Sequence, residues 1–142
     1  MALMPAAAQT SSLAGPGAPD TPMAPTKAPP PSITIPPAIA LQAHSAPLGL
    51  TFLTNATKLP ADYRGDLLVA YHGSWNRDVP TGAKVVRIRV KDNKPVSVED
   101  FITGWQSPDG KRWGRPADVA VAADGAVLIS DDAAGAIYRV VR

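Results

Sequence analysis

A few side chains in this sequence can bind ligands or transfer protons, and they lie in polar segments rich in turn-forming residues. The chain has two histidines, His44 and His72, and histidine serves as donor, acceptor or base near neutral pH. His72 opens the hexapeptide HGSWNR, which also holds Trp75 and Arg77. Arg115, inside the tetrapeptide WGRP, offers a planar fork that suits carboxylates. Together these residue types suit a flat ligand that carries carboxylate groups.

Each of these residues also has a purely structural interpretation. A loop histidine often only ties backbone segments together. Trp75 and Trp113 suit packing between sheets, while Arg77 and Arg112 suit contact with solvent. The pair Asp131-Asp132 can ligate a cation or stabilise a turn through side-chain hydrogen bonds. The sequence therefore leaves both roles open, and it assigns no catalytic residue and no metal ligand.

Short strands separated by turn residues must position these side chains. Residues 83–90 alternate apolar residues with Arg87 and Arg89, which is the period of a half-buried strand. Asp124-Gly125 is a strong hairpin signal. The predicted strands are residues 48–53, 66–71, 83–90, 96–102, 117–122, 126–130 and 136–141.

The last three predicted strands repeat the pattern of the first three. The sequence GDLLVAYHG at residues 65–73 resembles GAVLISDDAAG at residues 125–135. Repeated units of short antiparallel strands predict an all-β fold made of about two blades of a β-propeller. The second unit has only three strands. Because proline cannot donate to a central ladder, the proline-rich start of the chain is not expected to supply a fourth.

The strand order also predicts where the polar segments lie. In an up-and-down blade, the entry to the first strand and the exit of the second lie at the same end. Loops carried on such a scaffold are the usual place for a site. Four segments therefore gather on one face: residues 44–47, 71–77, 113–116 and 130–135.

The first 42 residues differ in composition from the rest. Ten of the sixteen prolines lie in residues 1–40, which contain two charged side chains and no aromatic residue. Such a segment cannot bury enough apolar surface to offset the entropy lost on ordering its backbone. We therefore expect residues 1–42 to be a disordered Pro/Ala-rich segment and residues 43–142 to be the folded domain.

Charge and composition exclude several functional classes. The net charge is +2 and no compact basic run is present, which argues against nucleic-acid binding. The absence of cysteine excludes disulfides and thiolate metal sites. No apolar run approaches the roughly 18 residues that a membrane span needs. The N-terminus also lacks the basic and apolar regions of a signal peptide.

Consecutive motifs over about residues 40–142 resemble the C-terminal portion of the glucose/sorbosone dehydrogenase family, and L-sorbosone dehydrogenase-like members in particular. The most specific blocks are HGSWNR and the series WGRP, SDDAAG and IYR. The resemblance implies a six-bladed propeller that holds pyrroloquinoline quinone (PQQ), often with calcium beside it. It also implies a sugar or aldose substrate, an electron acceptor, and a periplasmic or secreted location.

The resemblance assigns cofactor contacts to Arg115, His44, His72 and Gly73. Arg115 matches the arginine of the motif that enters the last blade, whereas Ala117 stands where some members have a second arginine. The histidine base and most calcium ligands of the family lie in blades outside this sequence. A base and a cofactor must be positioned together for hydride transfer, so the chain alone is expected to be an inactive fragment of a sugar dehydrogenase.

Two other classes stay open. One is a different propeller type, such as a metal-dependent lactonase or a protein-binding repeat propeller, although those lack the pairing of HGSWNR with WGRP. The other is a non-enzymatic module of about two blades that associates with copies of itself or with a partner through open strand edges.

Overall fold

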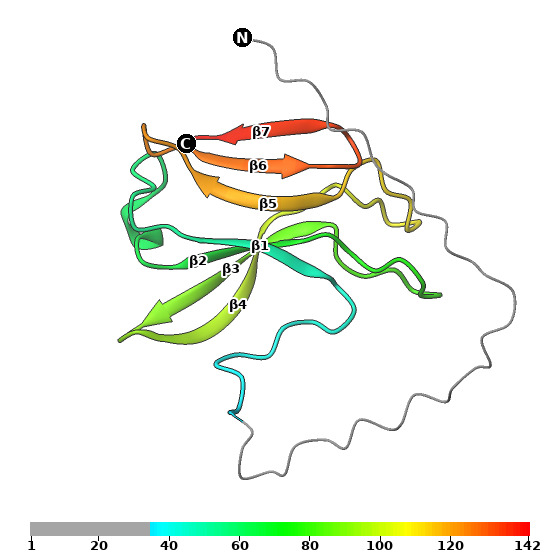
Figure 1. The fold of residues 1–142 in the computed structure, drawn as a ribbon, viewed down its shortest axis with the longest axis horizontal. Coiled ribbons are helices and arrows are strands. Elements are labelled where there is room, and N and C mark those ends of the chain that lie inside the picture. The colour runs from blue at the N-terminus through cyan, green and yellow to red at the C-terminus, as the bar shows by residue number, and fades with distance from the viewer. Residues whose placement is uncertain (1–34) are drawn as a thin grey trace, which may run out of the picture. The chain divides into compact units, whose positions relative to one another are not determined.

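Short antiparallel strands joined by tight turns make up the described part of the chain (Figure 1). The structure is a computed structural model, and it describes residues 35–142. Most of the segment expected to be disordered, residues 1–34, lies outside the described residues. Pro36–Arg142 form one compact unit.

The first sheet is antiparallel and has the strand order β1-β2-β3-β4. A two-residue turn joins its last two strands, and both turn residues, Asp92 and Asn93, have positive φ, as type I′ hairpins require. A short 3-10 helix, η2 (Ala61–Tyr63), precedes the second strand. The strands are β1 (Pro47–Phe52), β2 (Leu67–Tyr71), β3 (Lys84–Lys91) and β4 (Lys94–Ile102).

The second sheet is also antiparallel and has the order β5-β6-β7, with three strands among the described residues. Its first hairpin turns at the predicted Asp124-Gly125 pair, where Gly125 has φ +85°. The all-β prediction and the order of the strands are therefore confirmed. These strands are β5 (Pro116–Val121), β6 (Val127–Asp131) and β7 (Ala136–Val140).

The main core lies between the two sheets, where β1 and β2 contact β5. Leu68 and Val85 of the first sheet are fully buried, as are Val127 and Ile129 of the second. Each such side chain contributes about 1.5–3 kcal/mol through removal from water. This core fixes the two sheets against each other, and with them the loops at their ends.

A second cluster covers the opposite face of the first sheet. Val69, Tyr71, Val86 and Ile88 are buried there. Ile39 and Leu41 pack against these residues, so the irregular segment before β1 contacts the sheet. No helix within residues 35–142 is long and apolar enough to cross a membrane.

The strand predicted for residues 83–90 is confirmed, but only one of its two arginines, Arg89, is exposed to solvent. Arg87 is only 4% exposed and its Nη2 atom lies 2.6 Å from a carboxylate oxygen of Asp66. Its guanidinium also lies 3.6 Å from the ring centroid of Tyr63 and forms a 3.2 Å ion pair with Glu99. Arg87 therefore faces the interior of the molecule because Asp66, itself buried, neutralises it there.

Candidate functional site

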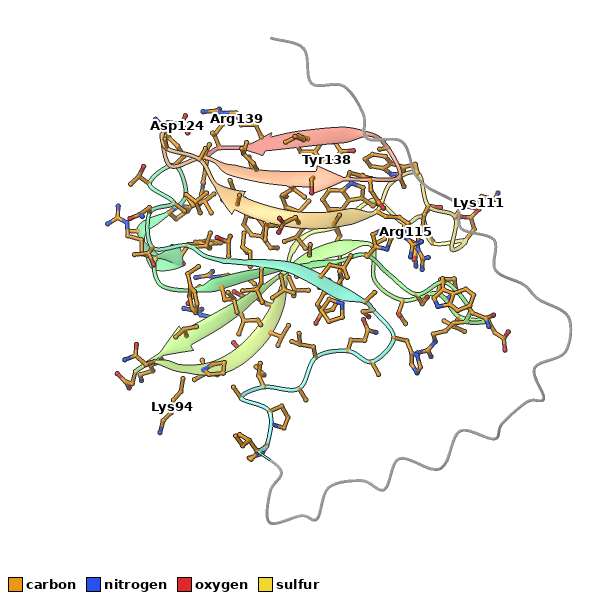
Figure 2. All side chains as sticks on the ribbon, viewed as in Figure 1. Lys94, Lys111, Arg115, Asp124, Tyr138 and Arg139 are labelled. Carbon is orange, nitrogen blue, oxygen red and sulfur yellow. The ribbon has the colours of Figure 1, made fainter. Side chains whose placement is uncertain are left out.

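The two ends of the sheets differ in character. Figure 2 shows Arg115 at the end opposite Asp124 and Arg139. The Asp124 end is held by connectors, in which the backbone N–H of Lys58 donates to the carbonyl of Gly125 at 3.1 Å. At the Arg115 end, hydrogen bonds join the polar segments that the strand order predicted to lie on one face.

The segment before β1 is tied to the exit of β2. The N–H of His72 donates to the carbonyl of Ala46 at 3.0 Å, and the N–H of Gly73 donates to the carbonyl of Ser45 at 2.8 Å. His44 and Ala46 adopt positive φ values of 61° and 46°, which turn the chain sharply around the buried Ser45. The sharp turn brings His44 beside the HGSWNR loop.

Arg115 clamps that loop from the second sheet. Its Nε atom donates to the carbonyl of His72 at 2.9 Å, and its Nη2 atom donates to the carbonyl of Gly73 at 2.7 Å. Its own backbone N–H donates to Asp131 Oδ1 at 2.8 Å. The fork of Arg115 thus binds main-chain oxygens, while its Nη1 atom makes no hydrogen bond within residues 35–142.

Arg112 is a second clamp, and the expectation that it contacts solvent is wrong. Its Nε atom donates to Gln106 Oε1 at 2.7 Å, Nη1 donates to the carbonyl of Ser74, and Nη2 donates to the carbonyl of Thr81 at 3.1 Å. Burial and the nearby charge of Arg115 lower the pKa of Arg112. Within residues 35–142, neither arginine forms an ion pair with a carboxylate.

The two aspartates after β6 have separate roles. Asp131 is buried, and it accepts hydrogen bonds from the N–H of Ala134 at 2.9 Å and from the hydroxyl of Tyr138 at 3.2 Å. Asp132 is exposed and accepts a 2.8 Å hydrogen bond from His72 Nε2, which lowers the pKa of its carboxyl group. Of the two roles that the sequence left open for this pair, the contacts of Asp131 favour turn stabilisation.

Gly73 occupies a position that only glycine fits. Its φ is +91°, and a Cβ atom there would lie 2.9 Å from the backbone nitrogen of Ala83 and 3.0 Å from the carbonyl oxygen of Thr81. The lack of a side chain lets the end of β2 close onto the segment that leads into β3. Gly73 therefore shapes the loop, and its cofactor contact stays a prediction.

The tryptophans separate into packed and exposed residues. Trp113 stacks on Trp105 with ring centroids 6.2 Å apart and meets Tyr138 edge-on at 6.3 Å. Its indole Nε1 donates to the carbonyl of Gly104 at 2.7 Å. Trp113 therefore packs one part of its indole against these rings, although the residue is 59% exposed. Trp75 is 88% exposed and belongs to none of these aromatic contacts.

A hollow of about 360 Å³ opens beside the HGSWNR loop. Two of the predicted cofactor residues, His44 and Gly73, line it. Arg115 and His72 do not, although Arg115 holds the carbonyl of Gly73. Ser74, Trp75, Asn76 and Arg77 of the HGSWNR loop also line it.

Comparison with known proteins identifies the family. Residues 31–142 match the TrAA12-like family. The chain belongs to this family. An uncharacterized protein of Borreliella burgdorferi (strain ATCC 35210 / DSM 4680 / CIP 102532 / B31) is 37% identical to it over 116 residues, which are 80% of this chain and 30% of the relative.

Two solved structures of related proteins are also similar to this chain. The holo form of the PQQ domain of pyranose dehydrogenase from Coprinopsis cinerea matches with a TM-score of 0.53 and 29% identity, over 70% of this chain and 27% of that one. The iodide structure of a Carbohydrate-Active Enzymes Family AA12 protein from Trichoderma reesei matches with a TM-score of 0.53 and 26% identity, over 68% and 24%. The chain thus spans less than a third of each relative. These similarities support a PQQ-dependent dehydrogenase-like chain and are not specific to the sorbosone type.

Proposed function

We propose that this chain forms two neighbouring blades of a PQQ-dependent sugar dehydrogenase propeller and contributes one edge of its cofactor site. Membership of the TrAA12-like family and similarity to a PQQ domain support the proposal. The resemblance places the histidine base outside this sequence, so we expect the chain alone to bind cofactor without turning over substrate.

The observation that carries the proposal is the guanidinium pair of Arg112 and Arg115. Burial and the charge of Arg115 both lower the pKa of Arg112, and no carboxylate of residues 35–142 pairs with either side chain. Two like charges held together in this way attract an anion, because a carboxylate would relieve their repulsion. The contacts of Arg115 with the loop use its Nε and Nη2 atoms, so its Nη1 atom is the donor available for a carboxylate.

The described residues fit the quinone better than they fit calcium. When bound, PQQ supplies the acceptor for the hydride of the sugar. Arg115 would hold a carboxylate of the cofactor, with His44, His72 and Gly73 around the same edge. Residues 35–142 contain no cluster of three or more histidine and acidic side chains that would ligate a metal ion. We therefore propose no calcium ligand from this part of the chain.

Titration of the full chain with PQQ, followed by cofactor absorbance and equilibrium dialysis, tests the proposal. We expect saturable binding, and we expect Arg115→Ala to weaken it at least about tenfold, as loss of a charged hydrogen bond implies. The matched control is Arg139→Ala, at the opposite end of the sheets, which should bind as the unchanged protein does. Absence of saturable binding would overturn the proposal.

Arg115→Ala could weaken binding either by removing a positive charge or by disordering the loop that Arg115 holds, and a second ligand distinguishes these two effects. The esterified quinone keeps the flat ring system and loses the carboxylate charges. We expect the unchanged chain to bind this ester as weakly as Arg115→Ala binds PQQ itself. Equal affinity of the unchanged chain for the acid and the ester would exclude the arginine pair as the anchor.

The outer face of the first sheet favours a second candidate, a self-associating module. Leu50 and Phe52 hold the same positions in β1 that Val119 and Val121 hold in β5, as the pairing of each strand with its neighbour shows. Val119 and Val121 pack in the core between the sheets. Leu50 and Phe52 are instead 58% and 57% exposed. In this candidate, the second sheet of another copy covers them, as the second sheet of the same chain covers the inner face.

A further inference from the structure

Strand β7 forms an open edge of the second sheet. Within residues 35–142 the strand order of this sheet is β5-β6-β7, and no described strand pairs with the outer side of β7 (Figure 1). The first sheet has a fourth strand, β4, in the equivalent place. An unpaired strand edge presents a row of N–H and C=O groups, which act as a template for another strand. Among the described residues, the second sheet therefore has one strand position unfilled.

Alternate residues of β7 face this open side. In an antiparallel sheet, the N–H and C=O groups of successive residues point to opposite neighbours. The N–H of Ala122 donates to the carbonyl of Ala126 at 2.8 Å, so the backbone of Ala126 faces β5. By alternation along β6 and the pairing of β6 with β7, the backbone of Tyr138 faces β6. The N–H and C=O groups of its two neighbours, Ile137 and Arg139, therefore point outward from the edge.

The outer edges of the two sheets differ in how well they are protected. β4 carries Lys94, Pro95, Glu99 and Asp100, and its pairing with β3 has two register shifts. Charged residues, proline and bulges are the features that keep edge strands from pairing with other chains. β7 has no proline, its pairing with β6 has no register shift, and its one charged residue is Arg139. Of these two edges, β7 is therefore the one that is free to pair.

The side chains of β7 hold the strand in place and leave this edge accessible. Tyr138 and Val140 pack against the main core, which fixes the inner face of the strand. Ile137 on the other face is 72% exposed. Arg139 forms an ion pair with Asp124, which neutralises its charge from within the same sheet. A strand that is already ordered accepts a partner strand at small entropic cost.

We propose that β7 is a dimerisation edge, at which the β7 strands of two copies of this chain pair antiparallel and join their second sheets into one. Antiparallel pairing of identical strands is symmetric, so each contact occurs twice. Only the register centred on Tyr138 gives every residue of β7 a partner, and it sets Ile137 opposite Arg139 of the second copy. The outward residues then exchange hydrogen bonds in both directions, and no like charges stand opposite each other.

This inference goes beyond the proposed function, because β7 contains none of the residues assigned to the cofactor edge. It also uses a different surface from the self-associating module, which associates through the exposed side chains of β1. Replacement of Leu50 and Phe52 by serine removes that route. The doubly substituted chain is therefore the background in which dimerisation through β7 is measured by sedimentation.

Amide hydrogen exchange of the full chain tests whether a second copy covers the edge. We expect the N–H groups of Ile137 and Arg139 to be protected at high protein concentration and to lose this protection on dilution, since only the dimer bonds them. The N–H of Tyr138, which faces β6, is the internal control and should stay protected on dilution. Fast exchange of Ile137 and Arg139 at every concentration would overturn the proposal. Protection that dilution does not change would also overturn it, because the edge would then be covered from within one chain.

Three substitutions of Ile137 test the register. Its side chain is exposed, so each variant should fold as the unchanged chain does. Relative to the neutral Ile137→Gln, we expect Ile137→Glu to tighten the dimer about threefold and Ile137→Lys to weaken it about threefold, because position 137 stands opposite Arg139 in both copies. Sedimentation equilibrium in the Leu50→Ser and Phe52→Ser background gives the three dissociation constants. Equal constants, or changes of the same sign for Glu and Lys, would overturn the proposed pairing.

Discussion

Arg112 and Arg115 place two positive charges side by side, and their partners are carbonyl oxygens of the HGSWNR loop and its return segment. Their residue types were visible in the sequence, but their contacts were not. The carbonyl oxygens that they bind lie 31 to 43 positions away along the chain, whereas Gln106, the partner of Arg112 Nε, is a local one. Only the packing of the two sheets brings those atoms within reach.

Removal of the Arg112 fork should loosen the loop. Arg112→Leu keeps an apolar stem and removes the donors to Ser74 and Thr81, so we expect a loss of about 2 kcal/mol in the free energy of unfolding. Urea denaturation measures this loss. Arg77→Leu, at the exposed tip of the same loop, should change stability by less than about 0.5 kcal/mol. Similar stability of the two variants would show that the clamp contributes nothing.

The His72–Asp132 pair predicts a pH dependence. The hydrogen bond from His72 lowers the pKa of Asp132 in the folded chain, so its contribution to stability is complete above the unfolded value of about 3.9. That contribution is lost as the pH falls through the lower, folded value. Carboxyl carbon NMR of Asp132 should show titration below that of a free aspartate, and His72→Gln should move the midpoint upward. An unmoved midpoint would mean that the contact does not form in solution.

At the scale of elements, the sequence predicted the strands because their alternation and turns are local signals. Each of the seven predicted strands appears, and Asp124-Gly125 forms its hairpin turn. The burial of Arg87 was not predictable, because it depends on Asp66 reaching the same interior position from another strand end. The packing of Ile39 and Leu41 was missed because composition alone assigned residues 1–42 to a disordered segment.

Asp66 should therefore be a stability determinant of the first sheet. Asp66→Ala leaves the buried Arg87 guanidinium with only the partly exposed Asp62 and Glu99 as partners, so we expect a loss of about 3 kcal/mol. Chemical denaturation measures the change. Asp124→Ala removes an exposed ion pair with Arg139 and a turn hydrogen bond from the N–H of Ala126, and it should destabilise the chain clearly less than Asp66→Ala does. The idea fails if the two substitutions cost the same.

Gly73 should tolerate no side chain. Gly73→Ala forces a positive φ on alanine and drives its Cβ atom against the backbone of Ala83, so we expect a loss of at least about 1–3 kcal/mol. Gly135→Ala is the control, because its φ is also positive, at +61°, but nothing lies within 4 Å of the added atom. The difference in melting temperature between the two variants measures the destabilisation caused by contact of the added Cβ atom with the backbone of Ala83.

At the scale of the whole molecule, Figure 1 shows β4 and β7 on opposite sides, with β1 and β5 between them. If a second copy covers the exposed residues of β1, the chain should sediment as a species larger than 14.8 kDa. Leu50→Ser together with Phe52→Ser should then shift the population toward the monomer, because a large exposed apolar patch drives association. Ile35→Ser is the control for loss of an exposed apolar residue elsewhere. A monomer at all concentrations would reject the self-associating module.

The approach of β1 to β5 limits how similar the two units can become. A Cβ atom on Gly49 would overlap Asp118, and Gly49 and Asp118 hold equivalent positions in the two repeats. Two copies of the second unit would set carboxylate against carboxylate, and two copies of the first would leave the contact without a side chain. The interface therefore requires glycine at position 49 while aspartate stands at position 118, and a side chain at position 49 would push the two sheets apart.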